Sequence, residues 1–268
     1  MIRNTFAVAR KEFGLFFTTP WAWIALTAML AISAFFFVGL LAAFQQAQML
    51  ARQYGWPAMP PEQHVFQNLT DGVIVNLFGT VMVITLFVAP FLSMRLFAEE
   101  RRQKTFELLM TLPVRPVEIV LGKYLGGTLI LFATLSVTLI FPAVVAIYGR
   151  GTEGSALDWP TVMLGYAALL MFGAACMAVG MFISSLTESQ AMAALVSFVV
   201  LLPWWLLGGL AQRSEEPVRS ILKHLSFDHQ LAPLFSGALD VKALVFFASV
   251  IVFALFLTHR RLEAFRWA

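Results

Sequence analysis

Six long stretches of almost uninterrupted apolar residues constrain this chain more than any other feature. They lie at about residues 21–44, 73–97, 117–148, 160–186, 190–210 and 241–258. An α-helix rises about 1.5 Å per residue, so about 20 residues cross the hydrocarbon core of a bilayer. The first stretch is also too long for the apolar region of a cleaved signal peptide. The sequence therefore predicts an all-α, polytopic membrane protein with six transmembrane helices.

The composition favours lipid over water as the solvent. Hydrophobic residues make up 60% of the chain and charged residues 12%, against about 45–50% and about 25% in soluble domains. The net charge of +3 suits the anionic cytoplasmic leaflet, and no basic stripe interleaved with aromatic residues points to nucleic acid. We therefore expect membrane lipids and no nucleic acid as partners. The one cysteine, Cys176, lies in an apolar stretch, which excludes a disulfide framework and a thiolate metal site within this chain.

Residues 2–17 have a different pattern from the six stretches. Apolar residues recur at helical spacing on one face, and polar residues occupy another: Ile2, Phe6, Ala9, Phe13 and Phe16 against Arg3, Asn4, Arg10 and Lys11. This pattern predicts an amphipathic helix in the membrane interface.

The distribution of basic residues predicts the orientation. With the N-terminus inside, twelve of the 18 Lys and Arg residues lie on the cytoplasmic side, so both termini are expected in the cytoplasm. Two external segments follow. Residues 45–72, rich in Gln and Pro, suit a polar cap, and residues 212–240 are expected to contain a short amphipathic helix on the outer surface.

Small residues and prolines within the apolar stretches predict packing and bends. Gly122 and Gly126 form a small-xxx-small face on which another backbone can approach closely. Pro90, Pro142 and Pro203 should kink the helices that contain them.

The most polar connection runs from Ala98 to Pro113 and reads AEERRQKTFELLMTLP. Glu100 and Lys104 stand four residues apart, as in a helical ion pair, and Pro113 should stop the helix. Periodicity alone is satisfied by an amphipathic connector with a solvated face.

Residues 99–109, Leu112-Pro113 and residues 117–124 resemble the cytoplasmic signature of ABC-2 type permeases. In that family two acids and basic residues precede Gly-Thr-Leu-Glu, leucines, Leu-Pro and a Gly-Lys-aromatic in the next span. Thr18 to Ala22, after Arg10-Lys11-Glu12, is most similar to the gliding-motility and copper-maturation branch. The resemblance covers nearly the whole chain as one transmembrane domain, residues 1–268. It departs at Lys104, where the family usually has glycine.

The resemblance implies a bacterial cytoplasmic (inner) membrane protein that pairs with a second permease subunit, identical or paralogous, and with two ABC ATPase subunits. ATP and Mg would bind in the ATPase, and no cofactor is expected in this chain, because Gly122-Lys123 lacks the preceding glycine of a phosphate-binding loop. The 98–113 segment then becomes the coupling element, and residues 212–240 close the outer mouth. The implied ATPase-coupling residues are Glu99, Glu100, Arg101, Arg102, Lys104, Thr105, Glu107, Leu108, Leu109 and Pro113.

The sequence also permits three other hypotheses. The chain could be a non-transporting membrane scaffold for a motility or maturation complex, with the 98–113 segment as its docking site. Glu99-Glu100 with Lys104 approximates the EExxxR element of an intramembrane protease, although lysine lacks the bidentate guanidinium of arginine. His224 and His229, with Asp228, could be read as metal ligands.

The polar residues inside the apolar stretches are mild, and no charged residue is expected at a membrane midplane. This argues against a proton-driven pump and favours energy from outside the membrane. An apolar path suits export of a hydrophobic or amphipathic substrate.

Overall fold

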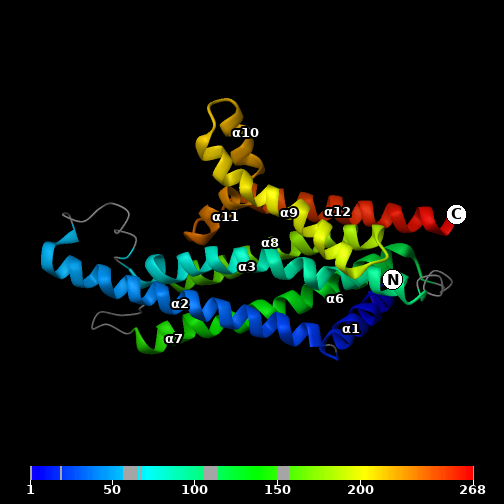
Figure 1. Cartoon of the computed structure of the whole chain (residues 1–268), viewed down its shortest axis with the longest axis horizontal. Helices are drawn as coiled ribbons and strands as arrows, with labels where there is room; N and C mark the ends of the chain where they lie inside the picture. Colours follow the sequence, from blue (N-terminus) through cyan, green and yellow to red (C-terminus); the bar gives the residue numbers. More distant parts are fainter. Residues whose placement is uncertain are drawn as a thin grey trace.

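The computed structural model describes residues 2–18, 20–56, 66, 68–105, 114–149 and 157–267, and all regular secondary structure in these ranges is helical. Six helices are long and apolar enough to cross a membrane, which confirms the predicted fold class. They form an elongated bundle with both chain ends at one end, here called the terminal end (Figure 1).

The chain runs through one amphipathic helix and six long helical stretches, with two short helices between the last two stretches. The helices are α1 (Ile2–Phe17), α2 (Pro20–Tyr54), α3 (Asn76–Ser93), α4 (Arg95–Arg102), α6 (Pro116–Ser136), α7 (Ile140–Tyr148), α8 (Trp159–Leu186), α9 (Gln190–Arg213), α10 (Val218–Leu225), α11 (Phe227–Phe235) and α12 (Val241–Trp267). A π-helical turn, Thr70–Val75, precedes α3, and a 3-10 turn, Val137–Leu139, joins α6 to α7.

Two helices extend past their predicted ends. The first continues from Phe44 to Tyr54, so the start of the expected polar cap is helical, and the last continues from Thr258 to Trp267. Both extensions consist of residues compatible with a helix and contain no Gly or Pro. The first stops at Gly55, whose φ of 79° suits glycine at a helix C-terminus.

Two predicted spans are interrupted. The regular α-helix of the third span breaks at the 3-10 turn just before Pro142, which has no N–H to donate to the carbonyl of Thr138. The second span is divided at Met94 into α3 and α4. Pro90 and Pro203 lie inside α3 and α9 respectively, without ending either helix.

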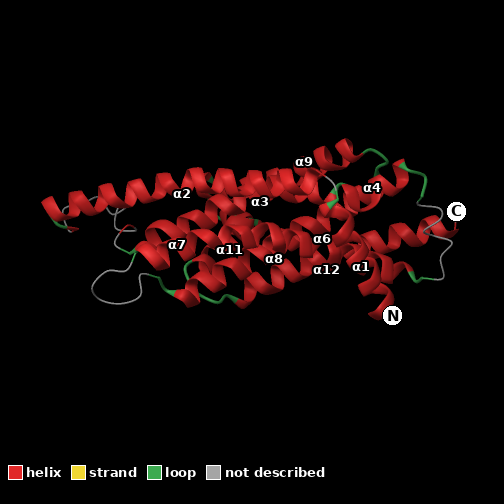
Figure 2. Ribbon diagram, turned by 90° about the horizontal axis from the view of Figure 1, so that it is seen from below, coloured by secondary structure: helices red, strands yellow, loops and turns green. Residues whose placement is uncertain are grey.

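Helix α8 is the centre of the bundle and contacts α3, α6, α9, α11 and α12. Figure 2 shows α2 and α3 along one side of the molecule and α8 and α12 along the other. Small residues permit this packing: a Cβ on Gly165 would overlap the ring of Phe78, and one on Gly180 would overlap Ser93. Only 22% of the residues in the most apolar part of each of α2, α9 and α12 are buried.

Residues 212–240, which the sequence predicts to be external, contain two helices where one surface helix was expected. Helix α10 buries none of its residues, whereas α11 buries Phe227, Leu231, Leu234 and Phe235. The Phe227 ring packs against Phe172 and Phe247 of the core, at 5.3 and 5.9 Å between centroids. The four buried residues of α11 recur one and two helical turns apart and so form one apolar face. This face packs against the bundle, whereas α10 remains on the surface.

Candidate functional site

The polar segment after α3 begins as helix α4 and ends in a tight turn at Lys104. The N–H of Thr105 donates to the carbonyl of Glu100 (3.0 Å), and the N–H of Lys104 donates to that of Arg101 (3.1 Å). This pair of hydrogen bonds is the Schellman motif, in which the residue after the cap adopts left-handed φ and is usually glycine. Lys104 occupies that position with φ of 56°. Helix α11 ends in the same way, with Gly237 at φ of 84°.

Three of the predicted coupling residues are half-buried and contact other side chains. The Glu99 carboxylate lies 2.8 Å from the Arg95 guanidinium, and Glu100 Oε1 lies 2.8 Å from Lys123 Nζ on α6. The Arg101 guanidinium lies 4.2 Å from the centroid of Phe265 on α12. The expected Glu100–Lys104 pair is therefore wrong: α4 ends before Lys104, and the Glu100 carboxylate pairs with Lys123 instead.

The other described members of the set are exposed. Arg102, Lys104 and Thr105, with Gln103 between them, form a polar strip at the terminal end of the bundle. We call residues 102–105 the exposed turn. Glu107, Leu108, Leu109 and Pro113 lie outside the described residues.

A buried lysine lies directly behind the exposed turn. The Lys123 side chain is 2% exposed, and Nζ lies 2.7 Å from Glu12 Oε1 of α1 as well as 2.8 Å from Glu100 Oε1 of α4. The ammonium also lies 5.3 Å from the ring centroid of Phe97. One cation thus joins three helices. An ammonium this deep is stable only because two carboxylates replace its water shell.

Helix α1 packs along α6 through the predicted glycine face. A Cβ on Gly122 would lie 2.8 Å from the carbonyl oxygen of Thr5, and one on Gly126 would lie 3.0 Å from that of Ala9. The expected role of these glycines in close packing is therefore confirmed. Of the apolar face predicted for α1, Ala9 and Phe16 are buried against the protein, whereas Phe6 is 67% exposed.

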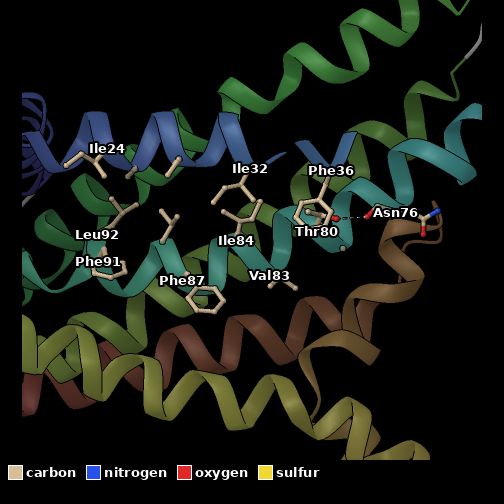
Figure 3. Close-up of a pocket in the computed structure, with 14 residues that line it drawn as sticks. Ile24, Ile32, Phe36, Asn76, Thr80, Val83, Ile84, Phe87, Phe91 and Leu92 are labelled. Carbon is tan, nitrogen blue, oxygen red and sulfur yellow. Dashed lines mark hydrogen bonds between the residues drawn. The ribbon is translucent and has the colours of Figure 1, made fainter. Parts of the chain in front are cut away.

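An apolar pocket of about 730 Å³ opens between α2 and α3 (Figure 3). Ile24, Ile32 and Phe36 of α2 line it opposite Ile84 and Leu92 of α3, whereas the rings of Phe87 and Phe91 lie on the side of α3 away from α2. Its two polar side chains already donate hydrogen bonds to backbone carbonyls four residues earlier in the chain. Asn76 donates to the carbonyl of Gly72 (2.9 Å), and Thr80 donates to that of Asn76 (3.4 Å). The pocket therefore offers dispersion contacts and few hydrogen bonds to a ligand.

A second pocket of about 880 Å³ lies between α3 and α9. Phe87 and Phe91 line both pockets, so the two hollows lie on adjacent faces of α3. Arg102, Glu188 and Gln190 give the second pocket a polar end, whereas Leu195 and Phe198 continue its apolar wall. Such a pocket can accommodate a molecule with an apolar body and a polar end.

A family model described as ABC-2 family transporter protein matches residues 6–259. The chain belongs to the ABC-2 transporter family. The inner membrane transport permease YhhJ of Escherichia coli (strain K12) is 31% identical to it over 171 residues, and its counterpart in Shigella flexneri matches equally well. The match covers 60% of this chain and 44% of each relative, so the chain spans less than half the length of the curated relatives it matches.

Membership identifies this ABC-2 protein as a membrane component of a transporter. Together with the six membrane-length helices and the inner membrane relatives, it makes the chain a multi-pass protein of the bacterial inner membrane.

The protease and metal hypotheses find no support in the geometry of this ABC-2 protein. Both Glu99 and Glu100 are engaged by basic side chains. His224 Nδ1 lies 2.7 Å from the carbonyl of Ser220. Among the residues that the structure describes, no three His, Cys, Asp or Glu side chains gather as a metal would require.

Sequence reasoning missed Glu12 and Lys123 as members of the site. The available signal was a lysine two turns inside an apolar stretch, which lipid does not tolerate without a partner. The partner itself could not be named, since Glu12 lies in a separate helix.

Proposed function

We propose that the chain is the permease subunit of an ABC exporter, with the exposed turn as the docking point of a separate ATPase. The observation that carries this proposal is that α4 and its turn have two kinds of side chain, some in contact with the rest of the protein and some exposed. The side chains of Glu100 and Arg101 hold the segment against α6 and α12, and Glu99 pairs with Arg95 within α4. Arg102, Gln103 and Lys104 remain exposed at the terminal end. A rigidly supported, basic turn suits an acidic groove on a partner.

The terminal end would face the cytoplasm in this arrangement, as the distribution of Lys and Arg predicts. ATP and Mg would bind in two ATPase subunits, and a second permease subunit would complete the transporter. The uncovered faces of α2 and α9 leave room for that second subunit or for lipid.

The cargo that suits the two pockets is hydrophobic or amphipathic. Both are lined mainly by apolar side chains, and the pocket between α3 and α9 ends in Arg102, Glu188 and Gln190. A small hydrophilic ion would have to leave its water shell without replacement hydrogen bonds in the pocket between α2 and α3.

The test is binding of the purified permease to a Walker-type ABC ATPase of its own host. We expect wild type to retain the ATPase through purification. Arg102→Glu combined with Lys104→Gly should weaken binding about tenfold or more, because a new acid then faces an acidic groove. The matched control is Arg219→Glu with Lys242→Gly, which changes the same charges in the external segment and at the start of α12, both exposed.

Equal binding by the two double variants would refute the docking point. Binding of the ATPase without any nucleotide-driven transport, in vesicles that retain the complex, would favour the non-transporting scaffold instead.

A further inference from the structure

We propose that Lys123 is the positioning residue through which the docked ATPase moves α1 and α6. This inference rests on the proposed function, because it requires an ATPase on the exposed turn. Glu100 lies two residues before that turn and is the link on α4, Glu12 is the link on α1, and α6 carries the lysine itself. Within the described part of the chain, no other cation lies within 4.0 Å of the Glu100 carboxylate.

The two ion pairs are strong because they are buried. The side chains of Glu12 and Glu100 are 14% and 17% exposed, and that of Lys123 is 2% exposed. Charge attraction increases as water is excluded, and the cost of leaving a buried ammonium with one carboxylate increases with it. A displacement of Glu100 therefore draws Lys123 along instead of breaking the pair.

Helix α1 must follow α6 in such a movement. Their backbones meet at Gly122 and Gly126, and Asn4 of α1 donates to the Glu118 carboxylate of α6 over 3.3 Å. Close backbone packing and a hydrogen bond at a second point make the two helices one rigid unit.

A second contact joins α4 to α1 beside the lysine. The Arg95 guanidinium lies 5.3 Å from the ring centroid of Phe16, and Arg95 is also the partner of Glu99. Helix α6 passes on into the core against α3 and α8. The exposed turn is therefore connected to the membrane helices through few contacts, and the ion pairs of Lys123 are the charged ones among them.

A lysine that merely holds the fold together must be distinguished from one that transmits movement. Lys123→Met alone leaves two buried carboxylates facing each other and can impair folding for that reason. The combination Lys123→Met, Glu12→Gln and Glu100→Gln removes every charge and keeps side chains of similar size. This neutral variant leaves Arg102 and Lys104 in place for docking.

The first readout is ATP hydrolysis by the complex in lipid vesicles, compared with the free ATPase. At saturating ATPase, where any loss of affinity is offset, we expect the neutral variant still to form the complex but to show a permease-dependent change in hydrolysis rate about tenfold smaller than that of wild type. Arg260→Met with Glu263→Gln, which removes an exposed ion pair of 3.1 Å on α12, is the matched control and should change neither.

The second readout is the distance between spin labels at Gln103→Cys and Arg10→Cys. Both native side chains are exposed, and the one native cysteine, Cys176, is fully buried. Wild type should give one narrow distance with and without trapped nucleotide, because α4 and α1 move together. The neutral variant should give a broad distribution when nucleotide is trapped.

A neutral variant with normal hydrolysis and a narrow distance would overturn the inference while the proposed function stands. Failure of wild type to bind any ATPase would instead remove the proposed function, and the inference with it.

Discussion

The Ser184 hydroxyl on α8 donates a hydrogen bond of 2.8 Å to the carbonyl of Met94, the residue that separates α3 from α4. The same oxygen accepts from the N–H groups of Phe97 (3.2 Å) and Ala98 (3.0 Å). One buried side chain thus satisfies backbone groups on both sides of the break. The position of α4, and of the exposed turn that follows it, depends on this contact.

Ser184→Ala should destabilise the protein by about 1–3 kcal/mol, because it leaves two N–H groups and a carbonyl without this partner in a dry core. Unfolding of the purified protein in detergent measures the change. Ser249→Ala is the control: that hydroxyl is exposed and donates to the Phe246 carbonyl of its own helix. A loss in the control as large as in the variant would contradict the role given to Ser184.

Gly126→Ala should also destabilise the fold, although alanine favours helices over glycine by about 1 kcal/mol. The new Cβ would lie 2.7 Å from the Cβ of Glu12 and 3.0 Å from the carbonyl oxygen of Ala9, so α1 must move away. Gly14→Ala, on α1, meets nothing within 4 Å and should stabilise the helix. Opposite signs of the two changes, measured by thermal unfolding, are the expected result.

Lys104→Gly should stabilise the isolated permease by about 1 kcal/mol, because glycine adopts left-handed φ without the clash of a Cβ. Lys104→Ala removes the same charge but keeps the Cβ, so it should give no such gain. The comparison, by unfolding in the absence of ATPase, separates backbone strain from charge. A gain of equal size in both variants would point to charge repulsion as the cause.

Trp204→Phe should loosen α10 while leaving the membrane helices intact. The indole N–H donates to the carbonyl of Leu225, the last residue of α10, over 2.7 Å, and the ring stacks on Phe227 at 4.5 Å. Phenylalanine keeps the stacking and loses the hydrogen bond. Faster amide exchange confined to α10 is expected, with Trp205→Phe as the control.

Much of the fold follows from the sequence because lipid imposes a simple rule. Backbone groups in hydrocarbon must bond within their own helix, so each apolar stretch of sufficient length becomes a helix. The glycines at 122 and 126 likewise predicted a close approach of backbones, which α1 makes. The ends of α2 and α12 were less predictable, since a helix can continue into polar residues until a Gly or Pro stops it.

The candidate site was only partly accessible from the sequence. The segment stood out by its charge, and Lys104 by its place in the resemblance to ABC-2 permeases, but the direction of each side chain did not follow from either. Glu100 could have paired with Lys104 one turn away or with a partner on another helix. A helix that ends at Arg102 removes the first choice.

By itself, the sequence determined the number of membrane helices and the family, because both depend on patterns that neighbouring residues carry. The tertiary structure decided which charges are buried and which face outward. Lys123 gains two carboxylates from α1 and α4 only after three helices have packed. The physical reason is that a buried charge is stabilised by the opposite charges and hydrogen-bonding groups beside it, and these come from helices that only the whole fold brings together.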